Sequence, residues 1–452
     1  MKSINPANGN LIAEYPEHSS VEVGEILQQV DAAQLLWRKS GFDERAKLMK
    51  NAANLLRQRK IEYARLITLE MGKVIREAEA EVEKSAWVCD FYANNAEKFL
   101  ADEVIETDAG LSFVAFEPLG TVLAVMPWNF PFWQVFRFTA PTLMAGNAGV
   151  LKHASNVPGC ALAIESVFRD AGFPENIFRT LMIPGSEVEK VIENEVIKAV
   201  TLTGSEAAGS KVAEAAGRNL KKTVLELGGA DPFIVLTDAD LELCASTAVT
   251  ARMINSGQSC IAAKRFIVVK EVADQFTGLV KQKMASLKTG DPTDPATDFG
   301  PLARPDLVDD LKAQIERSVK MGARVELGGN RIEGDGFFFE PTIITHVTEE
   351  MPVFNEETFG PVMAIIIVEN EQEAIRSANN SKFGLGGCVW TKNTGRGIAF
   401  ARQIESGAVF VNGMVKSDPR LPFGGIKSSG YGRELASYGI KEFVNMKTIW
   451  IK

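Results

Sequence analysis

Residues 121–227 are the part of the chain that most restricts its fold, because short apolar segments alternate there with longer segments of helical periodicity. Short apolar segments predict buried strands, and apolar residues three and four apart predict helices that pack on them. The predicted strands are 121–126, 149–152, 178–183, 199–203 and 223–227, and the predicted helices are 132–145, 158–171, 187–194 and 205–220. This order is typical of a parallel, doubly wound sheet, which binds ligands at the carboxyl ends of its strands. We therefore expect a nucleotide site there.

A second alternation of strand and helix begins near Asp231 and predicts a separate α/β lobe. Its predicted strands are 233–236, 265–269, 323–327, 364–367 and 387–390. Residues 1–100 are expected to be mostly helical, with helices over 21–39, 43–59, 61–69 and 75–100. Residues 112–116 have the alternating side-chain pattern of a β-strand, and residues 443–452 are also predicted to form a strand. We expect a ribbon that leaves the compact body and forms a contact between subunits.

Bulk properties exclude several functional classes. A net charge of −9 without a Lys/Arg cluster argues against a nucleic-acid surface. No segment approaches the roughly 18 apolar residues of a membrane span. Five scattered cysteines without a Cys-x-x-Cys pair fit a reducing compartment, and the N-terminus has no apolar leader, so we expect a cytoplasmic protein. The three histidines are not at metal-ligand spacing, so no metal is expected.

The segment from Asn255 to Arg265 places Cys260 after a short polar turn that contains Gly257. A thiolate is a strong nucleophile, and small neighbours let a ligand and the backbone approach it closely. The backbone N–H of Cys260 would then donate to an oxyanion formed beside the sulfur. The alternative is an inert thiol in the core, since free cysteines are among the most buried residues.

Two further polar residues follow predicted strands. Asn129 offers a side-chain amide that can stabilise an oxyanion, and Glu226, before a pair of glycines, offers a carboxylate that can act as a general base. Taken alone, Asn129 fits equally an Asx turn before Pro131, and Glu226 fits a solvated charge at a strand end.

Four motifs occur in the order Pro127–Pro131, Glu226–Gly229, Gly257–Cys260 and Glu356–Pro361. In these motifs, and over essentially its full length, the chain resembles the aldehyde dehydrogenase superfamily, and it is most similar to bacterial succinate-semialdehyde dehydrogenases that prefer NADP. The resemblance implies two doubly wound α/β lobes plus a β-ribbon for oligomerisation. It assigns residues 1–99 and 119–226 to cofactor binding, 227–432 to catalysis, and 100–118 with 433–452 to the ribbon.

The resemblance also implies a reaction. Cys260 attacks the aldehyde carbonyl, Asn129 and a backbone N–H stabilise the oxyanion, and the intermediate gives a hydride to the nicotinamide. Glu226 then activates the water that hydrolyses the thioester.

The cofactor residues follow from the same resemblance. Lys152 would bind a ribose, Gly204 and Ser205 would form the pyrophosphate turn, and Glu357 would lie on the nicotinamide-ribose side. The complete predicted set is Met126, Pro127, Trp128, Asn129, Lys152, Ala154, Ser155, Gly185, Gly204, Ser205, Glu226, Leu227, Glu357 and Phe359. Without the resemblance, Ser205 would be interpreted as a helix N-cap, and Lys152 and Glu357 as surface charges.

Ser155 indicates the choice of cofactor. Members of the family that prefer NAD often carry a glutamate three residues after the lysine, and it binds the adenosine 2′-hydroxyl. Serine removes a carboxylate that would repel a 2′-phosphate, while Lys152 supplies positive charge. NADP is therefore predicted, with NAD as a weaker cofactor, although Ser155 as a neutral N-cap would tolerate both.

The predicted substrate is a small aldehyde with a carboxylate. Trp133 and Arg137 share one face of a predicted helix, where a guanidinium can hold the carboxylate, and Ser259 and Ser417 are its companions by similarity. A structural ion pair is the alternative for Arg137. A dehydrogenase for a broader range of aldehydes, a coenzyme-A-acylating enzyme and a catalytically silent scaffold remain as alternatives for the whole chain. A homodimer or a homotetramer is expected.

Overall fold

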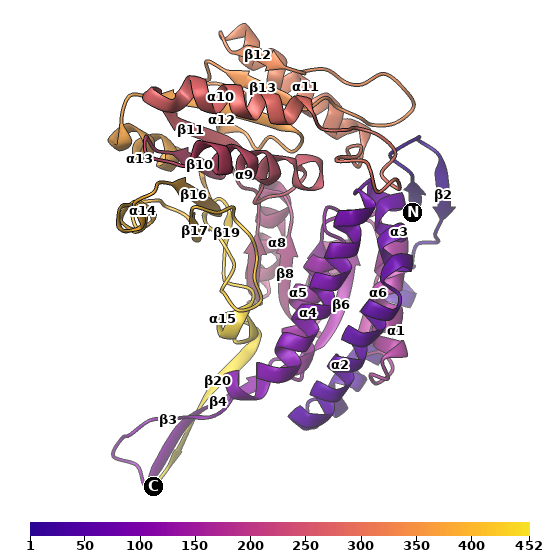
Figure 1. The fold of residues 1–452 in the computed structure, drawn as a ribbon. Coiled ribbons are helices and arrows are strands. Elements are labelled where there is room, and N and C mark those ends of the chain that lie inside the picture. Colours follow the sequence, from indigo (N-terminus) through magenta and orange to yellow (C-terminus); the bar gives the residue numbers. More distant parts are fainter.

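The computed structural model describes residues 1–452, which form two α/β lobes and a projecting ribbon (Figure 1). The first lobe has a six-stranded sheet with the order β19-β9-β8-β5-β6-β7. Its strands are β5 (Thr121–Met126), β6 (Ala148–His153), β7 (Phe178–Thr180), β8 (Ile197–Thr203), β9 (Lys222–Glu226) and β19 (Gly430–Tyr431). All neighbours run parallel except β19, which is antiparallel to β9. The predicted parallel sheet is confirmed.

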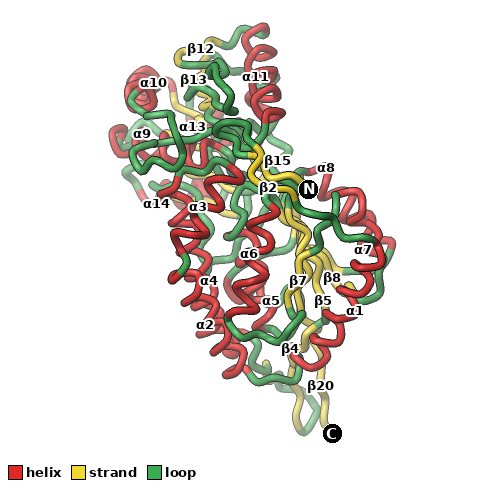
Figure 2. The backbone as a smooth tube through the Cα atoms, turned by 90° about the vertical axis from the view of Figure 1, so that its right-hand side faces the viewer, coloured by secondary structure: helices red, strands yellow, loops and turns green.

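Helices cover both faces of this sheet. Figure 2 shows α2, α4, α5 and α6 on one side and α1 and α7 on the other. The helices are α1 (Ser20–Trp37), α2 (Phe42–Gln58), α3 (Lys60–Met71), α4 (Ile75–Phe99), α5 (Trp133–Met144), α6 (Pro158–Asp170), α7 (Val188–Glu193), α8 (Glu206–Arg218) and the short 3-10 helix η1 (Gly185–Glu187). All 12 residues of α5 are buried, because this helix is apolar on nearly every side and lies between the sheet and α4.

The second lobe has a seven-stranded sheet with the order β12-β13-β14-β11-β10-β16-β17. Its strands are β10 (Pro232–Val235), β11 (Arg265–Val269), β12 (Arg324–Leu327), β13 (Thr342–Thr345), β14 (Val362–Val368), β16 (Gly386–Trp390) and β17 (Ala408–Val411). Its helices are α9 (Leu241–Met253), α10 (Lys270–Ala285), α11 (Pro305–Lys320), α12 (Pro352–Asn355), α13 (Glu371–Asn379), α14 (Thr394–Ala401) and the 3-10 helix η2 (Ile254–Gly257). Only β12 runs antiparallel to its neighbour, so this lobe is also mainly a parallel α/β layer structure.

The ribbon consists of β3 (Glu103–Val104), β4 (Leu111–Pro118) and β20 (Val444–Ile451). β4 and β20 pair antiparallel along their whole length, from Pro118 opposite Val444 to Leu111 opposite Ile451. Figure 1 shows the ribbon projecting from the first lobe, with the C-terminus at its tip. The predicted ribbon is present, and its role in oligomerisation stays a prediction.

The structure contains elements that the sequence patterns did not predict. They are the hairpin β1 (Lys2–Ile4) and β2 (Leu11–Glu14), the strands β13 and β17, the short strands β15 (Phe383–Gly384), β18 (Ile426–Lys427) and β19, and the helix α15 (Ala436–Ile440). Strands of two to four residues are too short to show a period of two. The predicted catalytic range, 227–432, includes residues 430–431. These two residues form β19, which pairs with β9 and therefore extends the sheet of the first lobe.

Candidate active site

The carboxyl ends of the first lobe's parallel strands open onto a groove of about 490 Å³ that reaches the Cys260 loop of the second lobe. The loops after β5, β6, β8 and β9 supply most of its wall, as expected for a doubly wound sheet. Twelve of the predicted site residues line it: Met126, Pro127, Trp128, Asn129, Lys152, Ala154, Gly204, Ser205, Leu227, Cys260, Glu357 and Phe359.

Cys260 is the only one of the five cysteines that is not fully buried. This exposure argues against the alternative of an inert core thiol. The surroundings nevertheless withdraw the sulfur from water and raise the pKa of Cys260 to about 12, while the nearby Lys264 ammonium opposes the shift. A thiolate at neutral pH therefore needs further stabilisation from groups that reach the sulfur.

The turn before Cys260 is held in an uncommon conformation. Asn255, Ser256 and Gly257 have φ values of 54°, 54° and 77°, in the left-handed region. Such a conformation costs about 1–3 kcal/mol for a residue other than glycine, so other contacts must maintain it. The Asn255 backbone N–H donates to Glu77 Oε2 at 2.8 Å, and its side-chain amide donates to the Asn129 carbonyl at 2.7 Å. These bonds fix the turn that presents the thiol.

Asn129 lies on the loop after β5 and is 4 % exposed. Its Nδ2 donates to the Gln258 carbonyl at 3.1 Å, and its Oδ1 accepts from Gln134 Nε2 at 3.1 Å, so its side chain does not form the alternative Asx turn. An amide nitrogen carries two hydrogens, and one stays available for an oxyanion. The Cys260 backbone N–H has no acceptor within the chain. One N–H of the Asn129 amide and the Cys260 backbone N–H are thus both without an acceptor in the protein.

Charged residues just before and within the first turns of α4 connect these loops. Lys73 forms a fully buried ion pair with Glu81, and its Nζ donates to the Asn129 carbonyl at 2.9 Å. Glu81 Oε1 accepts the backbone N–H groups of Phe132 and Trp133 at 2.8 and 3.1 Å, at the N-terminus of α5. A carboxylate is favourable at a helix N-terminus. Through these contacts and Glu77, α4 positions both the Asn129 loop and the Cys260 loop.

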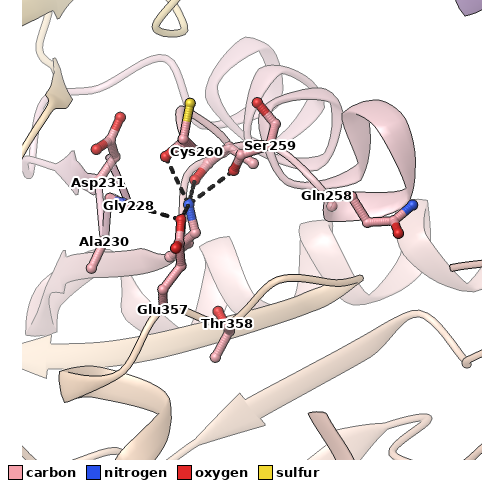
Figure 3. Close-up of polar contacts among 12 residues, drawn as sticks. Gly228, Ala230, Asp231, Gln258, Ser259, Cys260, Glu357 and Thr358 are labelled. Carbon is pink, nitrogen blue, oxygen red and sulfur yellow. Dashed lines mark hydrogen bonds and ion pairs between the residues drawn. The ribbon is translucent and has the colours of Figure 1, made fainter. Parts of the chain in front are cut away.

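Lys264 supports the Cys260 loop from the other side. Its Nζ donates to the carbonyls of Cys260, Ser259 and Ala262 at 2.8, 3.0 and 3.2 Å, and it lies 3.4 Å from Glu357 Oε1. Figure 3 shows Glu357 below the Cys260 loop, with dashed lines that run from the Lys264 nitrogen between them to the loop carbonyls and to Glu357. Burial lowers the pKa of Lys264. The nucleophile loop and the predicted nicotinamide-ribose carboxylate therefore share one buried cation.

Glu226 ends β9 and is 2 % exposed, so the alternative of a solvated strand-end charge is wrong. Neither of its carboxylate oxygens has a hydrogen-bond partner. Burial and the nearby Glu434 raise the pKa of Glu226 to about 8, while Arg137 opposes the shift. A carboxylate that titrates near the working pH fits a general base.

Arg137 forms a buried ion pair with Glu434, so the alternative that the sequence left open for this arginine is present. Its side chain is 3 % exposed, its Nη2 donates to Thr203 Oγ1 at 3.3 Å, and it lies over the Phe423 ring. Its predicted contact with a substrate carboxylate stays a prediction, and one negative partner already balances its charge.

The cofactor end of the groove contains polar groups with few partners. Lys152 is 8 % exposed, and burial alone, with no carboxylate acting on it, lowers the pKa of Lys152. It is therefore not the surface charge that the local sequence suggested. Ser205 is the N-cap of α8, because its Oγ accepts from the Ala208 N–H at 3.3 Å, and it also lines the groove.

Three predicted cofactor residues do not line this groove. Ser155 is exposed in the turn between β6 and α6, and the N-cap of α6 is Val157, so the N-cap alternative for Ser155 is wrong. Gly185 begins η1, and Glu226 is the buried last residue of β9.

The remaining predicted substrate residues are buried. Trp133, Ser259 and Ser417 are 4, 1 and 5 % exposed. Lys84 joins two of them, since its Nζ donates to Ser417 Oγ at 2.9 Å and lies 4.2 Å from the centre of the Trp133 ring.

Several residues of the site were not predicted. Gln134, Thr203, Gly228, Arg304, Leu307 and Asp310 also line the groove. Lys73, Lys84, Lys264 and Glu434 each contact a residue of the predicted site. Of these, only Gly228 gave a signal, as part of the motif after Glu226. Lys84 is one of many charges on a long helix, and nothing local distinguishes it.

Comparison with known proteins supports the resemblance. Residues 1–449 match the aldehyde dehydrogenase family. A protein of Synechocystis sp. named "probable succinate-semialdehyde dehydrogenase (NADP(+))" is 54 % identical over 449 residues, which cover 99 % of each chain. A succinate-semialdehyde dehydrogenase (NADP(+)) of Mycobacterium avium is 48 % identical over 99 % of this chain and 96 % of its own.

A solved structure agrees with these matches. Succinic semialdehyde dehydrogenase from Streptococcus pyogenes, crystallised with NADP+ as the cofactor, superposes with a TM-score of 0.98 at 39 % identity and covers 100 % of this chain and 99 % of its own. The predicted family and fold are confirmed. No helix of the chain has the length and apolar character needed to span a membrane.

Proposed function

The chain belongs to the aldehyde dehydrogenase family, and on that premise we propose that it oxidises succinate semialdehyde to succinate with NADP, and more weakly with NAD. The observation that carries the proposal is the partly exposed Cys260, which lies in the same groove as the unpaired Lys152. Relatives named NADP-dependent succinate-semialdehyde dehydrogenase, at 54 and 48 % identity, support the substrate and the cofactor.

The groove fits a phosphorylated dinucleotide. Lys152 supplies a cation that no carboxylate neutralises, and residue 155 is a serine rather than an acid. A Cβ on Gly228 would lie 2.6 Å from Glu357 Oε2, so glycine keeps the approach to this carboxylate open. The residues proposed to hold NADP are Lys152 and Ser155 at the phosphorylated ribose, Gly204 and Ser205 at the pyrophosphate, and Glu357 and Phe359 at the nicotinamide ribose. When bound, NADP accepts the hydride released by the substrate carbon.

Cys260 is the proposed nucleophile. Its thiolate forms a bond to the aldehyde carbon, and the carbonyl electron pair moves to oxygen, where the second N–H of Asn129 and the Cys260 backbone N–H donate to it. The two donors are held in place before substrate arrives, because Lys73, Asn255 and Gln258 fix the Asn129 loop. Loss of hydride from the same carbon leaves a thioester on Cys260.

Glu226 is the proposed base for hydrolysis. Its carboxylate accepts a proton from water while the water oxygen attacks the thioester carbon, and the sulfur leaves as thiolate. Its elevated pKa, about 8, makes the carboxylate a stronger base than an exposed glutamate.

The proposal is tested by following NADPH formation with succinate semialdehyde, with parallel reactions that contain NAD, coenzyme A or butanal. We expect turnover with NADP, slower turnover with NAD, no dependence on coenzyme A, and weaker use of butanal. Acyl-coenzyme A as the product would support the acylating alternative, equal use of butanal would support a broad-range enzyme, and no reduced cofactor would support a silent scaffold.

We also propose the domain roles that the resemblance implies. Residues 1–99 and 119–226 would hold the cofactor, 227–432 would carry the nucleophile, and the ribbon would join subunits into a dimer or a tetramer. Exposed apolar side chains on the ribbon, such as Trp450 at 51 % and Ile451 at 48 %, support the last point. The free cysteines fit the cytoplasm as its compartment.

A further inference from the structure

The positive charge of Arg137 is already matched within the protein. Its guanidinium pairs with Glu434, and Glu226, a second buried carboxyl group, lies close enough for Arg137 to lower its pKa. Glu434 has no other hydrogen-bond partner, so withdrawing Arg137 to bind a substrate would leave a buried carboxylate uncompensated. Arg137 therefore offers little surplus charge to an incoming anion.

Lys84 is the nearby cation whose charge is not matched. Its one hydrogen-bond acceptor is the neutral Ser417 hydroxyl, at 2.9 Å. The carboxylates that act on it from a distance are occupied elsewhere, because Glu81 pairs with Lys73 and Asp418 pairs with Arg420. A desolvated ammonium without a counter-ion binds an anion strongly.

The position of Lys84 connects it to the reaction centre. Its Nζ lies over the ring of Trp133, the first residue of α5, and the loop before this helix carries Asn129. Arg137, one turn further along α5, acts electrostatically on both Lys84 and Cys260. Lys84 and the nucleophile thus lie around the same buried helix.

We propose that Lys84, together with the Ser417 hydroxyl, binds the carboxylate of the semialdehyde and so selects acidic aldehydes. The inference rests on the proposed function and names the residue that gives it specificity. The Nζ donates to one carboxylate oxygen and the Ser417 hydroxyl donates to the other, while the Trp133 ring keeps the ammonium in place.

The protonation of Lys84 supports this role. Burial lowers the pKa of Lys84 to about 8, and the charges that face it are Arg137 from α5, Glu81 from its own helix, and Lys416 and Asp418 from the segment after β17. Below this pH the ammonium is present, and above it the charge is lost. The KM for succinate semialdehyde should therefore rise above about pH 8, while the KM for butanal should not follow.

The test uses Lys84→Met, Lys84→Arg and Arg137→Ala in the full-length protein, with Lys98→Met, an exposed site on the same helix, as the matched control. We expect Lys84→Met to raise the KM for succinate semialdehyde about 10- to 100-fold and that for butanal less than about threefold, since only one substrate carries the anion. Lys84→Arg should recover most of the loss and shift the rise in KM to higher pH. Lys98→Met should behave like the unmodified enzyme.

Arg137→Ala should reduce turnover of both aldehydes together, because it leaves Glu434 unpaired beside Glu226. The proposal is overturned if Lys84→Met affects both substrates equally or neither, or if Arg137→Ala alone shows the selective loss. The proposed function itself fails if the unmodified enzyme is inactive on succinate semialdehyde but active on butanal. This result differs from those that overturn the role of Lys84.

Discussion

The residues that support the Cys260 loop are bonded to the protein itself, whereas Lys152, at the cofactor end of the same groove, has no polar partner. Lys264 gives all of its donors to carbonyls of the Cys260 loop, and Asn129 has four hydrogen bonds to other segments. Lys152 faces no carboxylate, and Ser155 is exposed. The reaction centre is preorganised by the protein, and the cofactor end is completed by its ligand. Changes should therefore alter rate and stability in the first region and affinity in the second.

The largest effect should come from the thiol. Cys260→Ala should reduce aldehyde oxidation by about 1000-fold or more, because it removes the bond-forming atom. NADP binding, measured by quenching of the protein's tryptophan fluorescence, should remain. Substantial turnover of the alanine variant would show that the nucleophile lies elsewhere, and lost binding would show that the two regions are not separable.

Glu226→Gln should lower steady-state turnover about 100- to 1000-fold and leave a burst of reduced cofactor, because only deacylation needs the base. In the unmodified enzyme the deacylation rate should rise with pH through about 8, since the carboxylate is the active form and its folded pKa is raised. Single-turnover and steady-state kinetics separate the two phases. Disappearance of the burst would contradict the assignment.

Lys73→Met should affect rate and stability together, as expected for a residue that positions the reaction centre. It leaves Glu81 buried without its partner, which costs about 3–5 kcal/mol of unfolding free energy. It also releases the Asn129 carbonyl, so kcat should fall about 10- to 100-fold while the Kd for NADP changes little. A changed Kd for NADP with an unchanged kcat would show that Lys73 acts on cofactor affinity and does not position the reaction centre.

Ser155→Glu should have the smallest effect. A carboxylate near the phosphorylated ribose should shift the ratio of kcat/KM from NADP towards NAD by about tenfold, with no change in Tm because Ser155 is exposed. Ser155→Ala is the control for loss of the hydroxyl alone. An unchanged ratio in the glutamate variant would place Ser155 away from the ribose.

Long apolar segments made much of the fold predictable. The predicted strand 265–269 coincides with β11, and the predicted helices 21–39 and 75–100 agree with α1 and α4 within two residues at each end. Cys260, Asn129 and Glu226 could be named because each belongs to a motif with its own chemistry. Their environments could not be predicted, because Glu434 and Lys84 come from distant segments. The Arg137–Glu434 pair and the Lys84–Ser417 bond depend on tertiary packing.

The edge strand β19 determines the order in which parts of this protein can fold during synthesis. β9 receives its antiparallel neighbour from residues 430–431, which leave the ribosome long after residues 222–226 of β9. Until then the growing chain presents β9 as an open sheet edge, and Glu226 at its end lacks the segment that covers it. A nascent chain should thus form the first-lobe wall of its nucleotide groove early and its hydrolytic centre last, and chaperones that shield exposed strand edges should act during that interval.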